Sequence, residues 1–328
     1  MERSDRALMT RAMELADLVR GSTAPNPWVG ALVVTEQGEV YEGATAPPGG
    51  PHAEAAALES AGPRARGATL YTTLEPCAHQ GRTPACADAI IDAGVARVAI
   101  GVLDPDPQVS GRGAARLAES GVEVSVGECG AQIEEQLAPY LKHRRTGRPW
   151  VVLKLAATCD GRTAAPDGSS RWITGPDARL DAHRLRARSD AVLVGAGTVR
   201  ADDPELTARL DPPPARQPLR VVLGRAPDGA RVRPALELSG DLGAVLDELG
   251  RRGVLQVLVE GGPRVAHDFH VQGMVDRYVI YLAPALAGGD DAHPMMTGPG
   301  APTIDRFWRG KLVAVDRLGD DLRLELAA

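Results

Sequence analysis

The chain contains 328 residues, with 37 Lys+Arg against 43 Asp+Glu and a formal net charge of −6. Residues 1–145 carry 13 basic and 19 acidic residues, and residues 146–328 carry 24 of each. Neither half has the basic excess that nucleic-acid backbones usually require, so we expect a small-molecule partner and no nucleic acid. The sequence shows no long apolar run and no N-terminal signal pattern, which predicts a cytoplasmic protein without a membrane partner.

The first 145 residues alternate between helix-like and strand-like segments, a pattern typical of an α/β unit. Apolar residues at helical spacing predict a helix over residues 3–20. A Gln37-Gly38 turn between two apolar runs predicts a β-hairpin. The full set of expected strands is 30–35, 40–43, 68–72, 97–102 and 122–126, and further helices are expected at 52–61, 84–93, 114–119 and 131–143.

A His-x-Glu pair and two cysteines form the most specific motif of this half. His52, Cys77 and Cys86 offer one imidazole and two thiolates, a ligand set suited to Zn²⁺, and three protein ligands leave a fourth position for water. Glu54 lies too close to His52 to be needed as a ligand and is well placed to transfer protons. This arrangement is typical of zinc nucleobase deaminases. We therefore expect one catalytic zinc ion per chain.

Two other interpretations of the motif remain. The cysteines could be small buried side chains and His52 a surface residue. Alternatively, His79 could complete a closed structural zinc site, in which case Glu54 would have no role.

Residues 144–149 have the composition of a linker, and an α/β pattern restarts directly after them. We therefore predict two domains, residues 1–145 and residues 146–328. Strands in the second domain are expected at 150–156, 191–194, 219–223, 255–260 and 277–282, helices at 177–188, 242–251 and 264–272, and a terminal hairpin at 311–316 and 321–326.

The second half lacks the G-x-G-x-x-G fingerprint, so a Rossmann site is not expected. Two Gly-rich strand exits, residues 195–198 and 260–263, could approach one crevice and bind a nucleotide or phosphorylated ligand. Either segment alone is more typical of a structural turn, whereas the pair in one α/β domain favours a nucleotide or phosphorylated ligand. Lys154 interrupts an apolar strand, either because it points into that crevice or because the strand lies at an exposed sheet edge.

Several stretches together resemble one family over essentially the whole chain. They include PNPWVG, HAEAAAL, TLEPCAHQGRTPAC and DPDPQVSGRG in the first half, and LKLAATCDGRTA, VGAGTVRADDPELTAR and LVEGGPRVA in the second. On these motifs the chain is similar to the bifunctional riboflavin-biosynthesis deaminase–reductases. The long gap between Cys77 and Cys86 separates this family from deaminases that use a short Cys-x-x-Cys.

The resemblance implies an α/β fold, with an N-terminal cytidine-deaminase-like α/β/α domain and a C-terminal dihydrofolate-reductase-like α/β domain. It implies deamination of 2,5-diamino-6-ribosylamino-4(3H)-pyrimidinone 5′-phosphate, followed by NADPH-dependent reduction of the ribosyl group to give 5-amino-6-ribitylamino-uracil 5′-phosphate. Zinc held by His52, Cys77 and Cys86 would lower the pKa of its bound water, and Glu54 would transfer the protons.

The family's binding positions carry over to named residues. The NADPH-contact positions are Ala156, Trp172, Thr198, Asp202, Gly262, Pro263, Arg264, Val265, Ala266, His267 and Asp268. The substrate-contact positions are Asn26 in the first half and Ser170, Arg186, Leu206, Arg209 and Glu260 in the second. Lys154 and Glu260 are the catalytic candidates for proton handling beside the hydride transfer.

The chain departs from the family at three places. Thr45 stands where the family often has a histidine, and Asp106 replaces an asparagine and adds a negative charge. The region between residues 223 and 242 is short, which affects the surroundings of the cofactor. Arg225 lies near the position where relatives contact the nucleotide, so we expect it to select NADPH over NADH through the 2′-phosphate.

Two alternatives to this function remain. One is a paralogue that deaminates a related pyrimidine and has an inactive or altered reductase domain. The other is a nucleic-acid-editing deaminase, which the acidic first half opposes. We expect a homo-oligomer, either a dimer or a tetramer.

Overall fold

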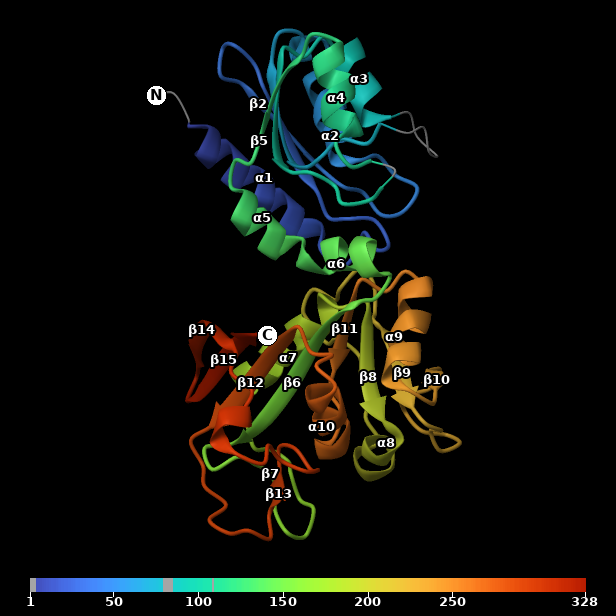
Figure 1. Cartoon of the computed structure of the whole chain (residues 1–328), viewed down its shortest axis with the longest axis vertical. Coiled ribbons are helices and arrows are strands. Elements are labelled where there is room, and N and C mark those ends of the chain that lie inside the picture. Colours follow the sequence, from blue (N-terminus) through green and yellow to red (C-terminus); the bar gives the residue numbers. More distant parts are fainter. Residues whose placement is uncertain (1–3, 79–84, 108) are drawn as a thin grey trace. The chain divides into compact units, whose positions relative to one another are not determined.

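The computed structural model describes residues 4–78, 85–107 and 109–328 of the chain. Two compact units, Met1–Gly147 and Arg148–Ala328, each have their own sheet (Figure 1). The predicted division after residue 145 lies inside helix α6 (Ala138–Thr146). That helix is closed by Gly147, which has a left-handed backbone (φ 72°) that glycine adopts without steric cost.

The first unit is a three-layer α/β/α structure. Its sheet has the order β2-β1-β3-β4-β5, in which β1 pairs antiparallel with β2 and β3, and β3, β4 and β5 are parallel. Helices α1 and α5 cover one face, and α2, α3 and α4 cover the other (Figure 1). The described elements are α1 (Asp5–Val19), β1 (Gly30–Val34), β2 (Val40–Ala44), α2 (Ala53–Ala61), the 3-10 helix η1 (Gly62–Ala65), β3 (Thr69–Leu74), α3 (Cys86–Asp92), β4 (Arg97–Val102), α4 (Arg112–Glu119), β5 (Glu123–Val126), α5 (Gly130–Gln136) and α6.

Close helix-to-sheet packing in this unit depends on glycine. A Cβ on Gly43 of β2 would lie 2.2 Å from the carbonyl oxygen of Ala53, at the start of α2. A Cβ on Gly30 of β1 would lie 1.9 Å from the carbonyl oxygen of Ala12 in α1. Real side chains do not tolerate such distances, so both helices approach the strands as closely as backbone allows. The start of α2 is thereby fixed against the sheet.

Two predicted helices of this unit need correction. The single helix expected over residues 131–143 is two helices, α5 and α6, separated at Leu137. The reason is Pro139 in the first turn of α6, which has no N–H to continue the helical ladder from α5. The helix expected from Pro84 begins at Cys86, and Pro84 itself lies outside the described residues.

The second unit is built on an eight-stranded sheet with the order β10-β9-β8-β11-β6-β12-β15-β14. The strands from β10 to β12 in this order are parallel, and the β14–β15 hairpin adds antiparallel strands at the other end. The described elements are β6 (Trp150–Thr158), β7 (Arg162–Ala164), α7 (Pro176–Ala187), β8 (Ala191–Gly195), α8 (Ala196–Asp202), β9 (Leu219–Leu223), β10 (Leu236–Leu238), α9 (Leu242–Arg251), β11 (Gln256–Val259), α10 (Pro263–Val271), β12 (Arg277–Ala283), β13 (His293–Pro294), η2 (Ile304–Arg306), β14 (Lys311–Leu318) and β15 (Asp321–Ala327).

Each face of this sheet buries its own apolar cluster. On one face, Leu249 of α9 and Phe269 of α10 pack against strand residues such as Leu153. On the other face, Ala178 of α7 packs with Val152 and residues of β8, β9 and β12. Because successive strand residues point to opposite faces, odd-numbered residues of β6 face α9 and α10, and even-numbered residues face α7.

Three features of the second unit differ from expectation. The Gly-rich exit after residue 195 is helical, as α8, although glycine has a low helix propensity. The short strands β7, β10 and β13 were not predicted, because two or three residues carry no periodic signal. The interpretation of Lys154 as part of an edge strand is wrong, since β6 lies between β11 and β12.

Across the described residues, no helix is both long and apolar enough to cross a bilayer.

Candidate active site

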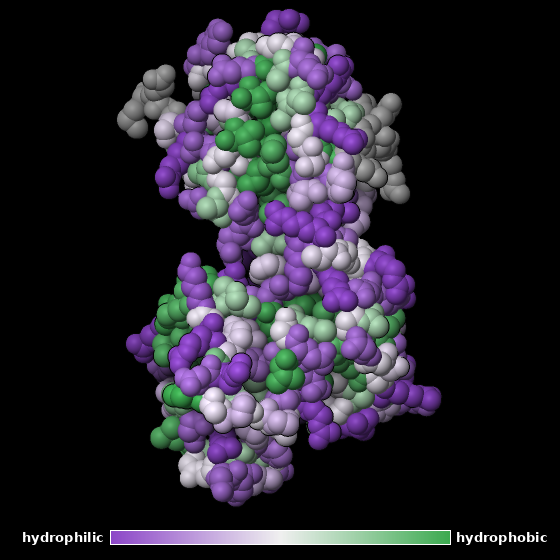
Figure 2. All heavy atoms as spheres, viewed as in Figure 1, coloured by the Kyte–Doolittle hydropathy of each residue, from purple (hydrophilic) through white to green (hydrophobic). Residues whose placement is uncertain are grey.

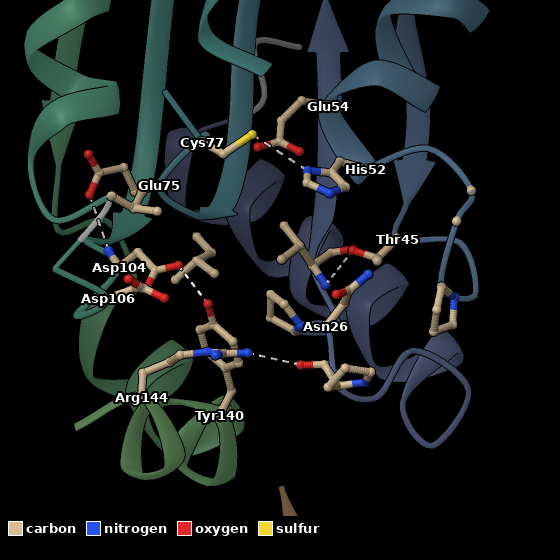
Figure 3. A pocket seen from close by; sticks show the side chains of 18 residues that line it. Asn26, Thr45, His52, Glu54, Glu75, Cys77, Asp104, Asp106, Tyr140 and Arg144 are labelled. Carbon is tan, nitrogen blue, oxygen red and sulfur yellow. Dashed lines mark hydrogen bonds between the residues drawn. The ribbon is translucent and has the colours of Figure 1, made fainter. Parts of the chain in front are cut away.

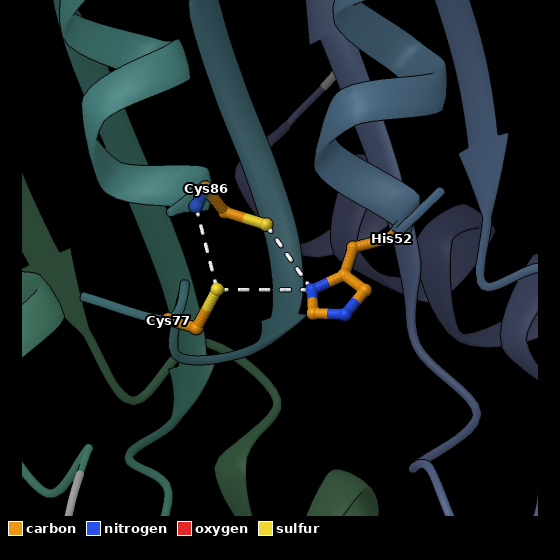
Figure 4. A group of neighbouring side chains, drawn as sticks. All are labelled: His52, Cys77 and Cys86. Atoms are coloured by element: carbon orange, nitrogen blue, oxygen red, sulfur yellow. Dashed lines mark hydrogen bonds between the residues drawn. The ribbon is translucent and has the colours of Figure 1, made fainter. Parts of the chain in front are cut away.

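Three secondary-structure boundaries deliver the predicted metal ligands to one point. His52 is the N-cap residue of α2, Cys77 follows β3, and Cys86 is the first residue of α3. The Nδ1 atom of His52 lies 3.3 Å from Sγ of Cys86 and 3.7 Å from Sγ of Cys77 (Figure 4). All three ligand atoms lie within 4.8 Å of one another.

These separations fit a zinc ion. Tetrahedral zinc with ordinary Zn–N and Zn–S bonds holds its nitrogen and sulfur ligands about 3.6 Å apart. Hydrogen bonding by Cys86, and then by His52, lowers the pKa of the Cys77 thiol, and the same contact with Cys77 raises the pKa of Cys86. Without a metal the two sulfurs therefore share one proton, and a bound metal would displace it. His79, the residue considered as a fourth ligand, lies outside the described residues.

Glu54 lies beside the metal ligands on the first turn of α2. Its side chain is buried, with 4% of the residue exposed, and it lines the same cavity as His52 and Cys77. Burial raises the pKa of Glu54 to about 7, because a carboxylate loses its hydration there. A carboxyl group with a pKa near neutrality can both accept and donate a proton.

A cavity of about 560 Å³ opens in front of these residues. The predicted substrate residue Asn26 lies in its wall, together with the family departures Thr45 and Asp106 (Figure 3). Thr45 is occupied locally, since its hydroxyl oxygen accepts a hydrogen bond from the backbone N–H of Val29. The lining also includes Asp104, Tyr140 and Arg144, which were not predicted from the sequence.

The buried carboxylate of Glu75 connects the backbone segments that form one wall of the cavity, and we call this group of contacts the Glu75 brace. The two oxygens of Glu75 accept hydrogen bonds from the backbone N–H groups of Asp104, Gly111, Gly113 and Ala114. Glu75 is only two residues before Cys77, so it ties the ligand-bearing segment to the loop after β4 and to the start of α4. Its role is to hold the site together, because its acceptor capacity is used by the backbone.

The second unit contains a buried ion pair among the predicted residues. Arg186 of α7 donates two hydrogen bonds to the carboxylate of Glu260, through Nε at 2.6 Å and Nη2 at 2.8 Å. Their side chains are only 14% and 9% exposed. Burial alone would raise the pKa of Glu260, but Arg186 and then Lys154 hold it below its usual value.

Lys154 belongs to the same group of charges. It projects from β6 on the face of α7, with its ammonium 5.7 Å from the centre of the Tyr281 ring. Burial lowers the pKa of Lys154. The negative charge of Glu260 partly opposes this lowering, and the positive charge of Arg186 adds to it. Lys154, Arg186 and Glu260, which are far apart in the sequence, are thus brought together.

The predicted cofactor residues gather at one end of the parallel strands. Gly262 donates its backbone N–H to the hydroxyl oxygen of Thr198 at 3.1 Å, so the two Gly-rich segments after β8 and β11 do meet. Ala156 lies near the end of β6, and Arg225 follows β9. Strands β9, β8, β11 and β6 are adjacent and parallel, so all these residues lie at their carboxyl ends, where α/β sheets bind ligands.

Arg171 donates a hydrogen bond to the carbonyl oxygen of Asp202, the last residue of α8, at 2.7 Å. This contact places the neighbouring Ser170 and Trp172 next to α8. The Trp172 side chain is exposed and lies under the guanidinium of Arg179, 4.6 Å from the ring centre.

The remaining predicted residues are less uniform. Arg209 is exposed and pairs with Glu205. Nε2 of His267 lies 3.0 Å from the carbonyl oxygen of Pro299. His267 belongs to α10, which also contains the predicted residues Pro263, Arg264, Val265 and Asp268. The side chains of Leu206 and Ala266 are in the core, so a ligand could reach these two positions only through the backbone.

Two family models match the chain. The cytidine and deoxycytidylate deaminase zinc-binding region matches residues 2–102, and the RibD C-terminal domain matches residues 149–324.

Curated relatives and solved structures are similar over nearly the whole chain. The riboflavin biosynthesis protein RibD of Escherichia coli (strain K12) is 40% identical, covering 98% of this chain and 99% of that protein. RibD of Mycobacterium tuberculosis (strain ATCC 25618 / H37Rv) is 43% identical, with 98% and 96% covered. The structure of Acinetobacter baumannii RibD has a TM-score of 0.92 at 37% identity and covers 98% of both chains. The diaminohydroxyphosphoribosylaminopyrimidine deaminase/5-amino-6-(5-phosphoribosylamino)uracil reductase of Thermotoga maritima has a TM-score of 0.89 at 34% identity, also with 98% of both chains covered.

Proposed function

The chain belongs to the RibD family of bifunctional deaminase–reductases of riboflavin biosynthesis, and from this membership we propose the substrate, the cofactors and the acting residues of each unit. The first unit, a zinc-binding deaminase, acts on 2,5-diamino-6-ribosylamino-4(3H)-pyrimidinone 5′-phosphate and releases ammonia. The second unit, a reductase, uses NADPH to convert the ribosyl group to ribityl. The product is 5-amino-6-ribitylamino-uracil 5′-phosphate.

The observation that carries the deaminase assignment is Glu54 beside the cluster of His52, Cys77 and Cys86, with His52 and Cys77 lining the same cavity as Glu54. His52, Cys77 and Cys86 would hold zinc, which supplies a water of lowered pKa. Glu54 accepts a proton and passes protons to the ring nitrogen and to the departing ammonia. Asn26 in the cavity wall binds the pyrimidine. A structural zinc site would leave Glu54 without a role.

In the reductase unit, the residues at the carboxyl ends of the strands fit a dinucleotide. The start of α10 and the glycines before it let backbone approach a phosphate closely, and Thr198 holds that segment in place. NADPH would supply the hydride there. Of the two proton-handling candidates, Lys154 has the lowered pKa that suits proton donation, whereas Glu260 holds Arg186 and offsets the positive charge.

Incubation of the purified protein with the diaminopyrimidinone phosphate tests this function. Without NADPH, we expect ammonia and the deaminated product alone. With NADPH, we expect oxidation of the cofactor and the ribityl product. Ammonia release without any NADPH oxidation would instead identify a paralogue with an altered reductase unit.

Arg225 is proposed to carry the preference for NADPH. Arg231 pairs with Glu205 and Arg233 pairs with Glu237, whereas Arg225 is exposed and has no acidic partner among the described residues. Its guanidinium therefore suits the 2′-phosphate.

For Arg225→Ala, we expect the ratio of kcat/KM for NADPH over NADH to fall about ten-fold or more, as for loss of a charge-assisted contact. The matched control is Arg251→Ala, which removes an exposed arginine of α9 and should leave the ratio unchanged. An unchanged ratio in Arg225→Ala would move the assignment to another residue.

We also propose a homo-oligomer that forms through the β14 edge of the second unit. β14 ends the sheet and exposes Leu312, Val313 and Val315, and Figure 2 shows apolar side chains over this edge. An open edge with apolar side chains favours pairing with another chain. Light scattering should find a dimer or a tetramer for the parent and a smaller species for Val315→Glu; a monomeric parent would contradict the proposal.

The compartment proposed is the cytoplasm. The support is chemical: both cysteine ligands must remain reduced, and the described cysteines are all free thiols.

A further inference from the structure

Arg144 is a cavity residue whose function the deaminase chemistry does not explain. It lies in the last turn of α6 and lines the cavity that also contains His52 and Glu54. Figure 3 shows Arg144 and Tyr140 across the cavity from His52 and Glu54. A ligand with its reacting ring at the metal ligands would therefore present its other end to Arg144.

The guanidinium of Arg144 is held in a fixed orientation. It lies over the Tyr140 ring, 5.0 Å from the centre, and its Nη2 donates a hydrogen bond to the carbonyl oxygen of Pro25 at 3.2 Å. Tyr140 is itself fixed, because its hydroxyl donates to Asp104 at 2.8 Å. The buried Nε of Arg144 has no hydrogen-bond acceptor among the described residues. A guanidinium has five N–H donors, so donors remain for a ligand.

The cavity is lined mainly by acidic groups. The described lining of the cavity includes the carboxyl groups of Glu54, Glu75, Asp104 and Asp106, and among the described lining residues Arg144 is the one Lys or Arg. Glu75 and Asp104 are occupied by hydrogen bonds from the protein. Among the described lining residues, Arg144 is therefore the cation that can offset the charge of a phosphate dianion in this acidic cavity.

We propose that Arg144 binds the phosphate group of the pyrimidine ribotide in the deaminase unit and so selects phosphorylated over unphosphorylated substrates. The inference rests on the proposed function for the identity of the substrate. Planar guanidinium forks bind phosphate oxygens with two parallel hydrogen bonds, and stacking on Tyr140 pre-orients this fork. A pre-oriented side chain loses little entropy on binding, which increases the affinity.

The competing explanation is that Arg144 only holds Pro25 and Tyr140 in place. Deamination kinetics with the ribotide and with the same compound after phosphatase treatment separate the two explanations. If Arg144 binds phosphate, Arg144→Gln should raise KM for the ribotide about ten-fold or more and leave KM for the unphosphorylated compound unchanged. For Arg144→Lys, KM for the ribotide should lie between the values of the parent and of Arg144→Gln, since lysine keeps the charge but cannot form two parallel hydrogen bonds.

The matched control is Arg145→Gln, which removes the same charge from the adjacent exposed position and should behave as the parent. An equal loss with both substrates in Arg144→Gln would overturn the proposal, because a structural defect does not distinguish them.

A binding measurement makes the test independent of the substrate assignment. Calorimetric titration with ribose 5-phosphate should detect one binding event in the parent that Arg144→Gln lacks; any binding to the reductase unit is common to both proteins. If the parent deaminates neither compound, the proposed function fails, and this titration still decides the role of Arg144. Identical titrations for parent and variant would overturn it.

Discussion

Glu54→Gln is expected to lose deamination while keeping zinc and reduction. The amide is nearly isosteric with the carboxyl group but cannot accept a proton, so the loss should be about 10²–10⁴-fold or more in kcat. The proposed metal ligands His52, Cys77 and Cys86 are unchanged, and metal analysis should still find about one zinc per chain. Deaminated substrate supplied directly should still be reduced, because Glu54 belongs to the other unit.

Two variants make this result specific. Glu59→Gln changes an exposed carboxylate on the same helix and should retain parental activity. Cys77→Ala should lose both zinc and deamination. Ammonia release at the parental rate by Glu54→Gln, or zinc retained in full by Cys77→Ala, would contradict the mechanism.

Glu260→Gln should be the most damaging single change in the second unit. Arg186 would keep its charge, with its side chain only 14% exposed, and would lose its anionic partner. Breaking a buried ion pair from one side costs about 3–5 kcal/mol of unfolding free energy. Lys154 would lose the same partner, so we expect reduction to fail, while deamination by the other unit continues.

Urea unfolding of the parent and the variant measures this loss of stability. Asp247→Asn provides the comparison, since it breaks the exposed ion pair with Arg148 and should have a much smaller effect on the free energy of unfolding. If the two substitutions lowered the free energy of unfolding equally, Arg186 would not be left as a buried charge without a partner when Glu260 is replaced, and the expectation would be wrong.

Most elements could be predicted wherever the apolar pattern is long and unbroken. Strand β4 (Arg97–Val102), strand β9 (Leu219–Leu223) and helix α9 (Leu242–Arg251) begin and end at the predicted residues. Local chemistry explains two of the errors. Pro139 divides a continuous helical pattern, and the glycines of residues 195–197 concealed α8, which tertiary contacts stabilise.

The clustering of His52, Cys77 and Cys86 could be predicted because these residues form a local motif, whereas the rest of the site depends on tertiary contacts. Lys154 could be assigned to a central strand only once the strand order was known. Glu260 and Arg186 are 74 positions apart, and nothing in the sequence pairs them. Tyr140 and Arg144 did offer a signal, since residues four apart share a helix face, but the predicted linker obscured it.

The Glu75 brace bears on how metal affinity is achieved. Many small zinc modules order their chain only when the ion binds, so part of the binding energy is spent on folding. In this protein, backbone hydrogen bonds to Glu75 already fix the segment that bears Cys77, and a Cβ on Gly113 would lie 1.9 Å from the carbonyl oxygen of Pro76. Preorganisation of this kind leaves more of the coordination energy as affinity. A side chain at Gly113, outside the cavity, would therefore weaken zinc binding indirectly, because it would displace Pro76 and with it the neighbouring ligand Cys77.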